Sequence, residues 1–153
     1  MKKRYVLPAD ISAITLITKE QWENVSSTIP NIPIETNWWW WTSSPATGSD
    51  GEQKVWCIGR EGELHKYGRS YGNCGIRPVI TIFGMEADLG DKIIIGSSCT
   101  GTAIGKETVL IDTVMSTHRF DENTSSYKDA EIKTFVENEV LRMFKEGINE
   151  LFR

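Results

Sequence analysis

The pattern of apolar and polar positions changes once along the chain, from short β-like runs to a helical repeat. Five short segments are rich in branched aliphatic residues and are bounded by Gly, Pro, Asp or Ser, which is typical of strands. They lie at residues 14–18, 54–59, 75–83, 91–98 and 107–115. A Gly-rich turn is expected at residues 101–105, between the last two. The pattern predicts β structure until about Ser116.

Two helices complete the expected fold. Thr18 and Gln21 form a capping-box pattern that predicts a short helix through Trp22 and Val25. Ser126 with Asp129 resembles a second helix start, and apolar residues then recur at helical spacing to Phe152. We therefore predict an α+β fold of short antiparallel strands with a short N-terminal helix and a long C-terminal amphipathic helix. We expect one domain over residues 1–153, with a Trp-rich β half at 14–84 and the later strands and helix at 88–153.

Four consecutive tryptophans, Trp38 to Trp41, raise the question of function. In a strand, Trp38 and Trp40 share one face, and Trp39 and Trp41 share the other. We assign Trp38 and Trp40 to the core, whereas Trp39 and Trp41 are equally compatible with a core and with a ligand surface. Burial of all the tryptophans remains the alternative.

Aromatic and arginine side chains that anchor interfaces or stack on flat ligands follow this run. The candidate ligand-binding residues are Trp39, Trp41, Trp56, Arg60, Tyr67, Arg69 and Tyr71. The residues to which we assign structural roles are Trp38, Trp40, Pro45, Gly75, Arg77 and Pro78, with Arg77 paired inside the protein.

Composition and charge exclude several classes of partner. The chain has 39% hydrophobic and 25% charged residues, a net charge of -4 and a pI near 5.3, which disfavours binding to nucleic acid. No apolar run approaches the roughly 20 residues of a membrane span, so no membrane partner is expected. Residues 1–8 lack the apolar stretch of a secretory signal, so we expect synthesis in the cytoplasm.

Sites for catalysis or cofactors are weakly indicated. Cys57, Cys74 and Cys99 form no CxxC pair and have only His65 and His118 as possible company in a metal site, so buried thiols are expected and neither a metal nor a cofactor is predicted. No nucleophile motif accompanies either histidine, and residues 101–108 lack Walker spacing. Calcium binding at Asp50 or in residues 120–129 is an open alternative to solvated acidic loops.

The segments "WWTSSP" (40–45), "VWCIGREGEL" (55–64) and "GIRP" (75–78), read in order, resemble a domain of unknown function that is widespread in gut Firmicutes and their prophages. Its usual signature is Trp-Trp-Leu-Arg-Ser-Pro, a "YV..DG" hairpin, and Gly-Val-Arg-Pro. Ser43 stands where that family usually has arginine. "GDKIIIG" (90–96) and "DAEIKTFVENEVLRMF" (129–144) resemble parts that normally lie upstream, so the halves stand in permuted order.

This resemblance implies a C-type-lectin-like fold, similar to that of formylglycine-generating enzymes and phage variable tail proteins. It implies a non-enzymatic, virion or tail-associated module that is made in the host cytoplasm and binds a carbohydrate or protein surface. Self-association is expected through the apolar face of the helix from Tyr127 to Phe152. The alternatives are a thiol enzyme related to the formylglycine-generating group, with Cys57 and Cys74 close together in a cleft, and a purely structural decoration or connector protein.

Overall fold

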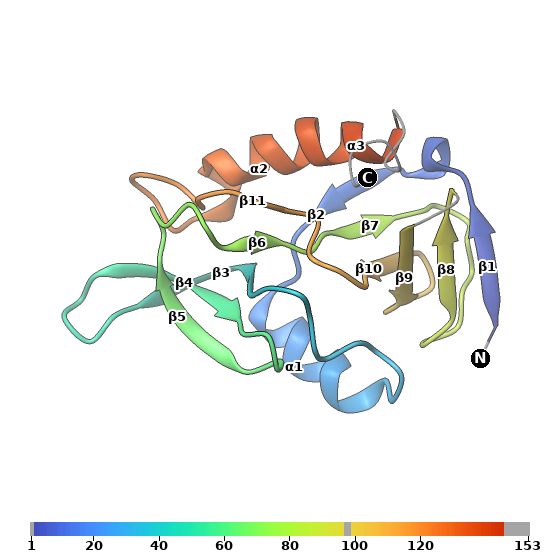
Figure 1. The fold of residues 1–153 in the computed structure, drawn as a ribbon, viewed down its shortest axis with the longest axis horizontal. Helices are drawn as coiled ribbons and strands as arrows, with labels where there is room; N and C mark the ends of the chain where they lie inside the picture. Colours follow the sequence, from blue (N-terminus) through green and yellow to red (C-terminus); the bar gives the residue numbers. More distant parts are fainter. Residues whose placement is uncertain (1, 97–98, 146–153) are drawn as a thin grey trace.

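The computed structural model describes residues 2–96 and 99–145, and it has an α+β fold built on two curled sheets. Figure 1 shows the strands between two helical layers, with α1 on one side and the C-terminal helix on the other. The predicted fold class is thus confirmed at the level of α+β.

The first sheet has six strands and contains the first strand of the described chain. In spatial order its strands are β1 (Lys3–Val6), β8 (Lys92–Ile95), β9 (Cys99–Ala103), β10 (Thr108–Ile111), β7 (Val79–Thr81) and β2 (Ala13–Thr15). The prediction of antiparallel strands was wrong for β1, because β1 pairs with β8 in parallel. Strands of the two predicted halves share this sheet, with β8, β9 and β10 of the later half beside β7 and β2 of the earlier one.

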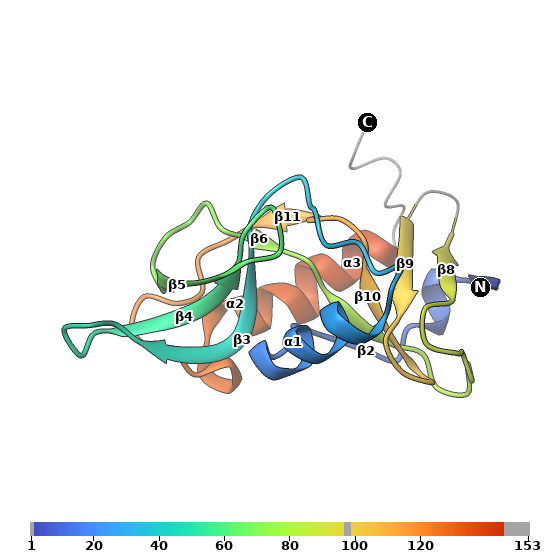
Figure 2. The same cartoon turned by 90° about the horizontal axis from the view of Figure 1, so that it is seen from below.

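The second sheet has five strands and carries the tryptophan run. Its spatial order is β11 (Ser116–Thr117), β6 (Gly75–Ile76), β3 (Trp40–Thr47), β4 (Gln53–Ile58) and β5 (Leu64–Gly68). The hairpin of β3 and β4 projects from the body of the molecule in both views (Figures 1 and 2). The register of this hairpin shifts between Trp41 and Pro45. Pro45 lies opposite Val55 of β4, beyond Trp40, where β3 pairs with Gly75 of β6.

One short segment joins the two sheets. The predicted single strand at residues 75–83 is broken at Arg77 and Pro78, with β6 in the second sheet and β7 in the first. Gly75 is tightly enclosed where β6 meets β3, since an added Cβ would lie 2.3 Å from Val114 and 2.6 Å from the Trp39 carbonyl oxygen. A residue without a side chain lets the two strands approach.

Both faces of the joined sheets are covered by helix. Helix α1 (Lys19–Thr28) begins at the predicted capping box, in which Thr18 accepts from the Gln21 N–H, and it buries Trp22 and Val25. On the opposite side a helix built of α2 (Glu131–Phe135), a π-helical turn (Val136–Val140) and α3 (Leu141–Lys145) buries an apolar stripe. The chain also forms short 3₁₀ turns at Pro8–Asp10 and Tyr127–Asp129.

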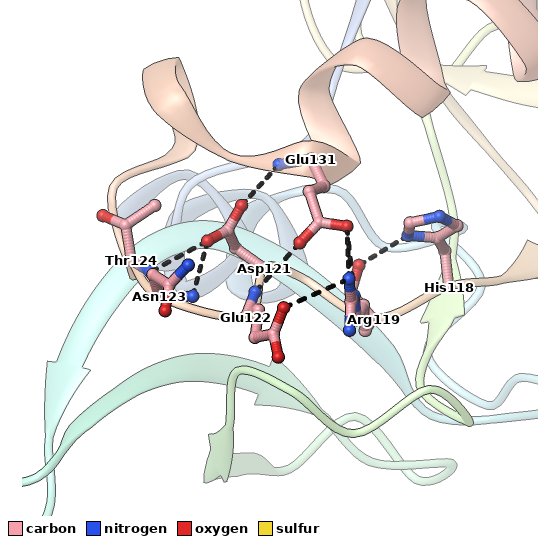
Figure 3. A network of polar contacts seen from close by, with 7 residues as sticks. All are labelled: His118, Arg119, Asp121, Glu122, Asn123, Thr124 and Glu131. Atoms are coloured by element: carbon pink, nitrogen blue, oxygen red, sulfur yellow. Dashed lines mark hydrogen bonds and ion pairs between the residues drawn. The ribbon is translucent and has the colours of Figure 1, made fainter.

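Asp121 organises the start of the C-terminal helix (Figure 3). Its Oδ1 accepts from the Glu131 N–H at 2.8 Å, and its Oδ2 accepts from the N–H groups of Asn123 and Thr124 at 2.7 and 2.9 Å. Burial works to raise the pKa of Asp121, but these backbone donors outweigh it and leave that pKa below its ordinary value. The helix therefore begins at Glu131 and not at the predicted Ser126 pattern.

Three local predictions need correction. The expected turn at residues 101–105 is largely strand β9, because Gly101 and Thr102 pair with β8 and β10. The apolar helix face is not free for a neighbouring subunit, since Ile132, Val136 and Val140 are fully buried inside the same chain. The part of the predicted helix from residue 146 to Phe152 lies outside the described residues.

Candidate functional site

The tryptophan run divides between core and surface. Trp40 and Trp41 begin strand β3 and are both fully buried, on opposite sides of the sheet. Trp39 is half-buried, and Trp38 is 37% exposed. The assignment of Trp38 to the core was thus wrong, because the strand starts only at Trp40. The prediction of Trp41 as a ligand-binding residue was also wrong, since a side chain with no exposed area does not face a ligand.

Trp38 and Trp39 line a surface depression of about 760 Å³, which we call the aromatic depression. It lies where the chain before β3 meets the β4–β5 turn and β5. Its lining residues are Glu35, Thr36, Trp38, Trp39, Gly59, Arg60, Glu61, Glu63, His65, Lys66, Tyr67 and Asn73. Of the predicted ligand-binding residues, it therefore brings together Trp39, Arg60 and Tyr67.

The rings in and beside the aromatic depression meet at steep angles. The Trp38 and Trp39 centroids are 6.3 Å apart with planes at 69°, and Trp39 and Tyr67 are 4.1 Å apart at 64°. Tyr71 continues the row with its ring 4.5 Å from Tyr67, although it does not line the depression. Trp38 is fixed by its indole N–H, which donates to the Asn73 carbonyl at 2.5 Å. The aromatic walls are therefore held in place before any ligand arrives.

The polar rim of the aromatic depression contains three carboxylates. The carboxylates are those of Glu35, Glu61 and Glu63, and all three residues are exposed. Glu63 is engaged with the Glu61 N–H at 3.1 Å and His65 Nε2 at 3.2 Å. Hydrogen bonds from the backbone and from His65 hold the pKa of Glu63 below its ordinary value. Sequence reasoning missed these residues because isolated acids in a turn give no signal of a shared site.

Some rim groups are unpaired. Within the described part of the chain, the side chains of Glu35, Arg60 and Glu61 make no hydrogen bond or ion pair. Their charges are free to meet a ligand. By contrast, the Lys66 ammonium donates to the Thr47 carbonyl at 3.0 Å and lies 5.3 Å from the Trp56 ring. Because Lys66 and Tyr67 are successive residues in β5, that ammonium lies on the other face of the strand from Tyr67.

Three predicted ligand-binding residues lie elsewhere. Trp56 is on the face with Lys66, and both the Lys66 and Lys19 ammonium groups lie over its ring, the latter at 5.0 Å. Arg69 donates to the Gln53 carbonyl at 3.0 Å and is not part of the aromatic depression. Trp41 donates from its indole N–H to the His118 carbonyl at 2.8 Å inside the protein.

Arg77 is a buried cation that lies between two tryptophan rings in the core. Its guanidinium carbon lies 5.5 Å from the Trp22 ring centroid and 4.9 Å from that of Trp40. It donates to the Ile111 carbonyl at 2.6 Å and to the Pro33 carbonyl at 3.0 Å. Burial lowers the pKa of Arg77 to about 10, against a smaller opposing effect of Asp112. The side chain remains a cation at neutral pH, enclosed by two indoles.

Cysteine geometry bears on the thiol-enzyme alternative. Cys57 and Cys74 lie close enough for the Cys57 thiol to affect the pKa of Cys74, so the expected closeness is present. Both are fully buried in the core, so the expected cleft is absent at this pair. Burial and the neighbouring Cys57 raise the pKa of Cys74 far above its ordinary value, which disfavours a thiolate nucleophile.

Metal binding finds little geometric support in the described residues. No group of three or more His, Cys, Asp or Glu side chains within residues 2–96 and 99–145 is arranged to hold a metal ion. In the segment considered for calcium, both carboxylate oxygens of Asp121 accept backbone N–H groups instead.

A membrane-crossing segment is also missing from the helices that the structure describes, since none of them is long and apolar enough.

Comparison with known proteins identifies a family and nothing more specific. No curated protein and no solved structure matches the chain. A family profile matches residues 4–83, which contain every residue that lines the aromatic depression but not β8, β9 or β10. Because this match covers more than half of the sequence, the chain belongs to the family described as Domain of unknown function (DUF6273).

Proposed function

We propose that the protein is a non-enzymatic binding module whose aromatic depression holds a carbohydrate. The observation that carries this proposal is the corner of Trp38 and Trp39, fixed before binding and bordered by the unpaired side chains of Glu35, Arg60 and Glu61. Aromatic faces supply apolar contact to a sugar ring, and nearby charged groups exchange hydrogen bonds with its hydroxyls.

The finer proposal is a lectin-like module associated with a phage virion or tail. It rests on the resemblance in sequence to a prophage-associated family with a C-type-lectin-like fold. In such a setting the module would recognise a surface and assemble with other virion proteins. Any self-association would use a surface other than the C-terminal helix, because Ile132, Val136 and Val140 are buried in the same chain.

The two alternatives are less well supported. A thiol enzyme needs an accessible thiolate, whereas Cys57 and Cys74 are buried. A connector protein with all tryptophans in its core is at odds with the exposure of Trp38.

The test is calorimetric titration of the full chain with a panel of soluble oligosaccharides, repeated on Trp38→Ala. We expect saturable binding that Trp38→Ala weakens by about tenfold or more, since stacking on an aromatic ring contributes on the order of 1 to 3 kcal/mol in related ring contacts. Trp56→Ala is the matched control, because it removes an indole from the other face of the same sheet. Equal loss in both variants, or binding to proteins alone, would contradict the proposal.

A further inference from the structure

We infer that the aromatic depression takes a cationic group, and that the ligand carries a trimethylammonium group at the Trp38–Trp39 corner. This inference rests on the proposed function and names the chemistry of the ligand at the same site.

The ring geometry fits a cation. A cation is attracted to an aromatic face within about 6 Å of the ring centroid. The Trp38 and Trp39 centroids are 6.3 Å apart with planes at 69°, so one cation in the angle between them lies within that reach of both rings. Tyr67 packs against Trp39 at 4.1 Å and adds a third aromatic side chain to the lining. Two steep walls suit a rounded group such as trimethylammonium better than they suit a flat ring.

The charges around the Trp38–Trp39 corner also favour a positively charged ligand. The carboxylates of Glu35, Glu61 and Glu63 face one guanidinium, that of Arg60, in the lining of the aromatic depression. Lys66 does not balance them, because its ammonium lies over Trp56 on the other face of β5. The excess negative charge therefore attracts a cation and repels an anionic ligand.

The hydrogen bonds at the corner indicate a ligand that needs few hydrogen-bond donors from the protein. The Trp38 indole N–H is already used on the Asn73 carbonyl, and the Thr36 hydroxyl donates to the Trp38 carbonyl at 2.7 Å. These contacts leave ring surface, carboxylate oxygens and the Arg60 guanidinium free in the lining of the aromatic depression. A quaternary ammonium group donates no classical hydrogen bond and is held by ring faces and negative charge alone.

The experiment is calorimetric titration of the full chain with choline chloride and with 3,3-dimethylbutanol, its uncharged isostere of nearly the same shape. Sodium chloride at equal ionic strength corrects for screening. We expect choline to bind at least tenfold more tightly than the isostere. Equal affinity for both compounds would overturn the inference, because it would show that the corner selects apolar volume and not charge.

Variants test the location. Glu35→Gln and Glu61→Gln should each weaken choline binding several-fold, whereas Glu52→Gln, at an exposed position outside the lining, should leave it unchanged. Trp38→Ala should abolish measurable binding, and its thermal melting curve serves as the control for folding. If the Glu35 and Glu61 variants bind choline like the parent chain, the assignment of the site is wrong.

The outcomes separate this inference from the proposed function. If the chain binds neutral oligosaccharides, Trp38→Ala loses that binding, and choline does not bind, the inference of a cationic ligand is wrong. The proposed carbohydrate-binding function is then still supported. Absence of all binding overturns both. If choline binds, titrations with a trimethyl-lysine peptide and with a choline-substituted saccharide show which kind of molecule carries the trimethylammonium group. Preference for the peptide would support the cationic ligand and overturn the carbohydrate proposal.

Discussion

The buried pair Trp40 and Trp41 and the surface pair Trp38 and Trp39 are adjacent in sequence but lie in different environments. Trp40 packs edge-on against Trp22 at 5.1 Å on the α1 side, and Trp41 packs against Phe120 at 5.6 Å on the side of the C-terminal helix. Both faces of the sheet are covered at this point. Alternation along a strand therefore sorts these two residues into two cores, and not into core and solvent.

The surface pair differs because it precedes the strand. Trp38 and Trp39 lie before the first β3 residue, so strand alternation does not govern them. The boundary is set by the pairing of Trp40 with Gly75 and Ile58. The residue at which a strand begins therefore decides which aromatic residues are available to a ligand.

Truncation of the chain after Gly84 should have the largest effect on the core that encloses Trp40 and Trp41. This removes β10, which pairs with β7, and the Ile111 carbonyl that accepts from Arg77. We expect complete loss of the cooperative fold, measured as the absence of a thermal transition by circular dichroism. A soluble, folded fragment with protected Trp40 would show that the tryptophan half folds alone.

Among the single substitutions considered, Trp40→Ala should lower the free energy of unfolding most. Truncating a fully buried tryptophan leaves a cavity and is expected to lower the free energy of unfolding by about 3 to 5 kcal/mol. Urea denaturation measures the change. An effect below about 1 kcal/mol would mean that α1 does not pack on β3 as described.

Arg77→Lys tests whether the enclosed cation depends on its planar shape. Lysine keeps the charge but loses the guanidinium fork that reaches the Ile111 and Pro33 carbonyls and stacks between Trp22 and Trp40. We expect a loss of about 2 to 3 kcal/mol in the free energy of unfolding. A melting temperature equal to that of the parent chain would contradict this role.

Asp121→Asn tests the support of Trp41, because Asp121 fixes the segment that carries Phe120. We expect a loss of about 1 to 2 kcal/mol at pH 7. The folded state lowers the pKa of Asp121 from its ordinary 3.8, so its contribution is present above that pH and is lost as the pH falls through the lower folded value. Urea denaturation at pH 7 and pH 3 should thus show a smaller difference between variant and parent at pH 3. A constant difference would exclude the charge as the cause.

Trp38→Ala should have the smallest effect on stability, within about 0.5 to 1 kcal/mol, because the side chain is 37% exposed. Iodide should quench part of the tryptophan fluorescence of the parent chain, and this variant should lose much of the quenchable part. Trp40→Phe, at a fully buried position, is the control that should leave the quenchable part unchanged. Equal quenching in both variants would place Trp38 in the core after all.

Local patterns in the sequence predicted the elements that depend on neighbouring residues. The capping box at Thr18 gave the start of α1, and the apolar repeat gave the C-terminal helix. Strands β4, β8 and β10 were predicted because their apolar residues are consecutive. The aromatic and arginine content before β6 indicated a surface of interest, and part of it lies in the aromatic depression.

The remainder depends on contacts between distant residues. Strands β1 and β9 hold Lys, Arg, Thr and Gly, and they are strands because they flank β8. The break at Pro78 separates two sheets, which no local pattern indicates. The exposure of Trp38 follows from a strand boundary fixed by Gly75, and the acidic rim is assembled from both sides of β3 in the sequence.

The sheet order also has a consequence for how the protein is made. β1 pairs with β8 and β2 pairs with β7, so each of these strands leaves the ribosome well before the strand with which it pairs. Non-local pairing of this kind gives a high contact order and slow folding, on the scale of milliseconds to seconds. Until residues 131–145 are translated, the nascent chain carries the tryptophan run without the C-terminal helix that covers the Trp41 side. Chaperone binding to this segment and a strong dependence of soluble yield on growth temperature are the expected signs.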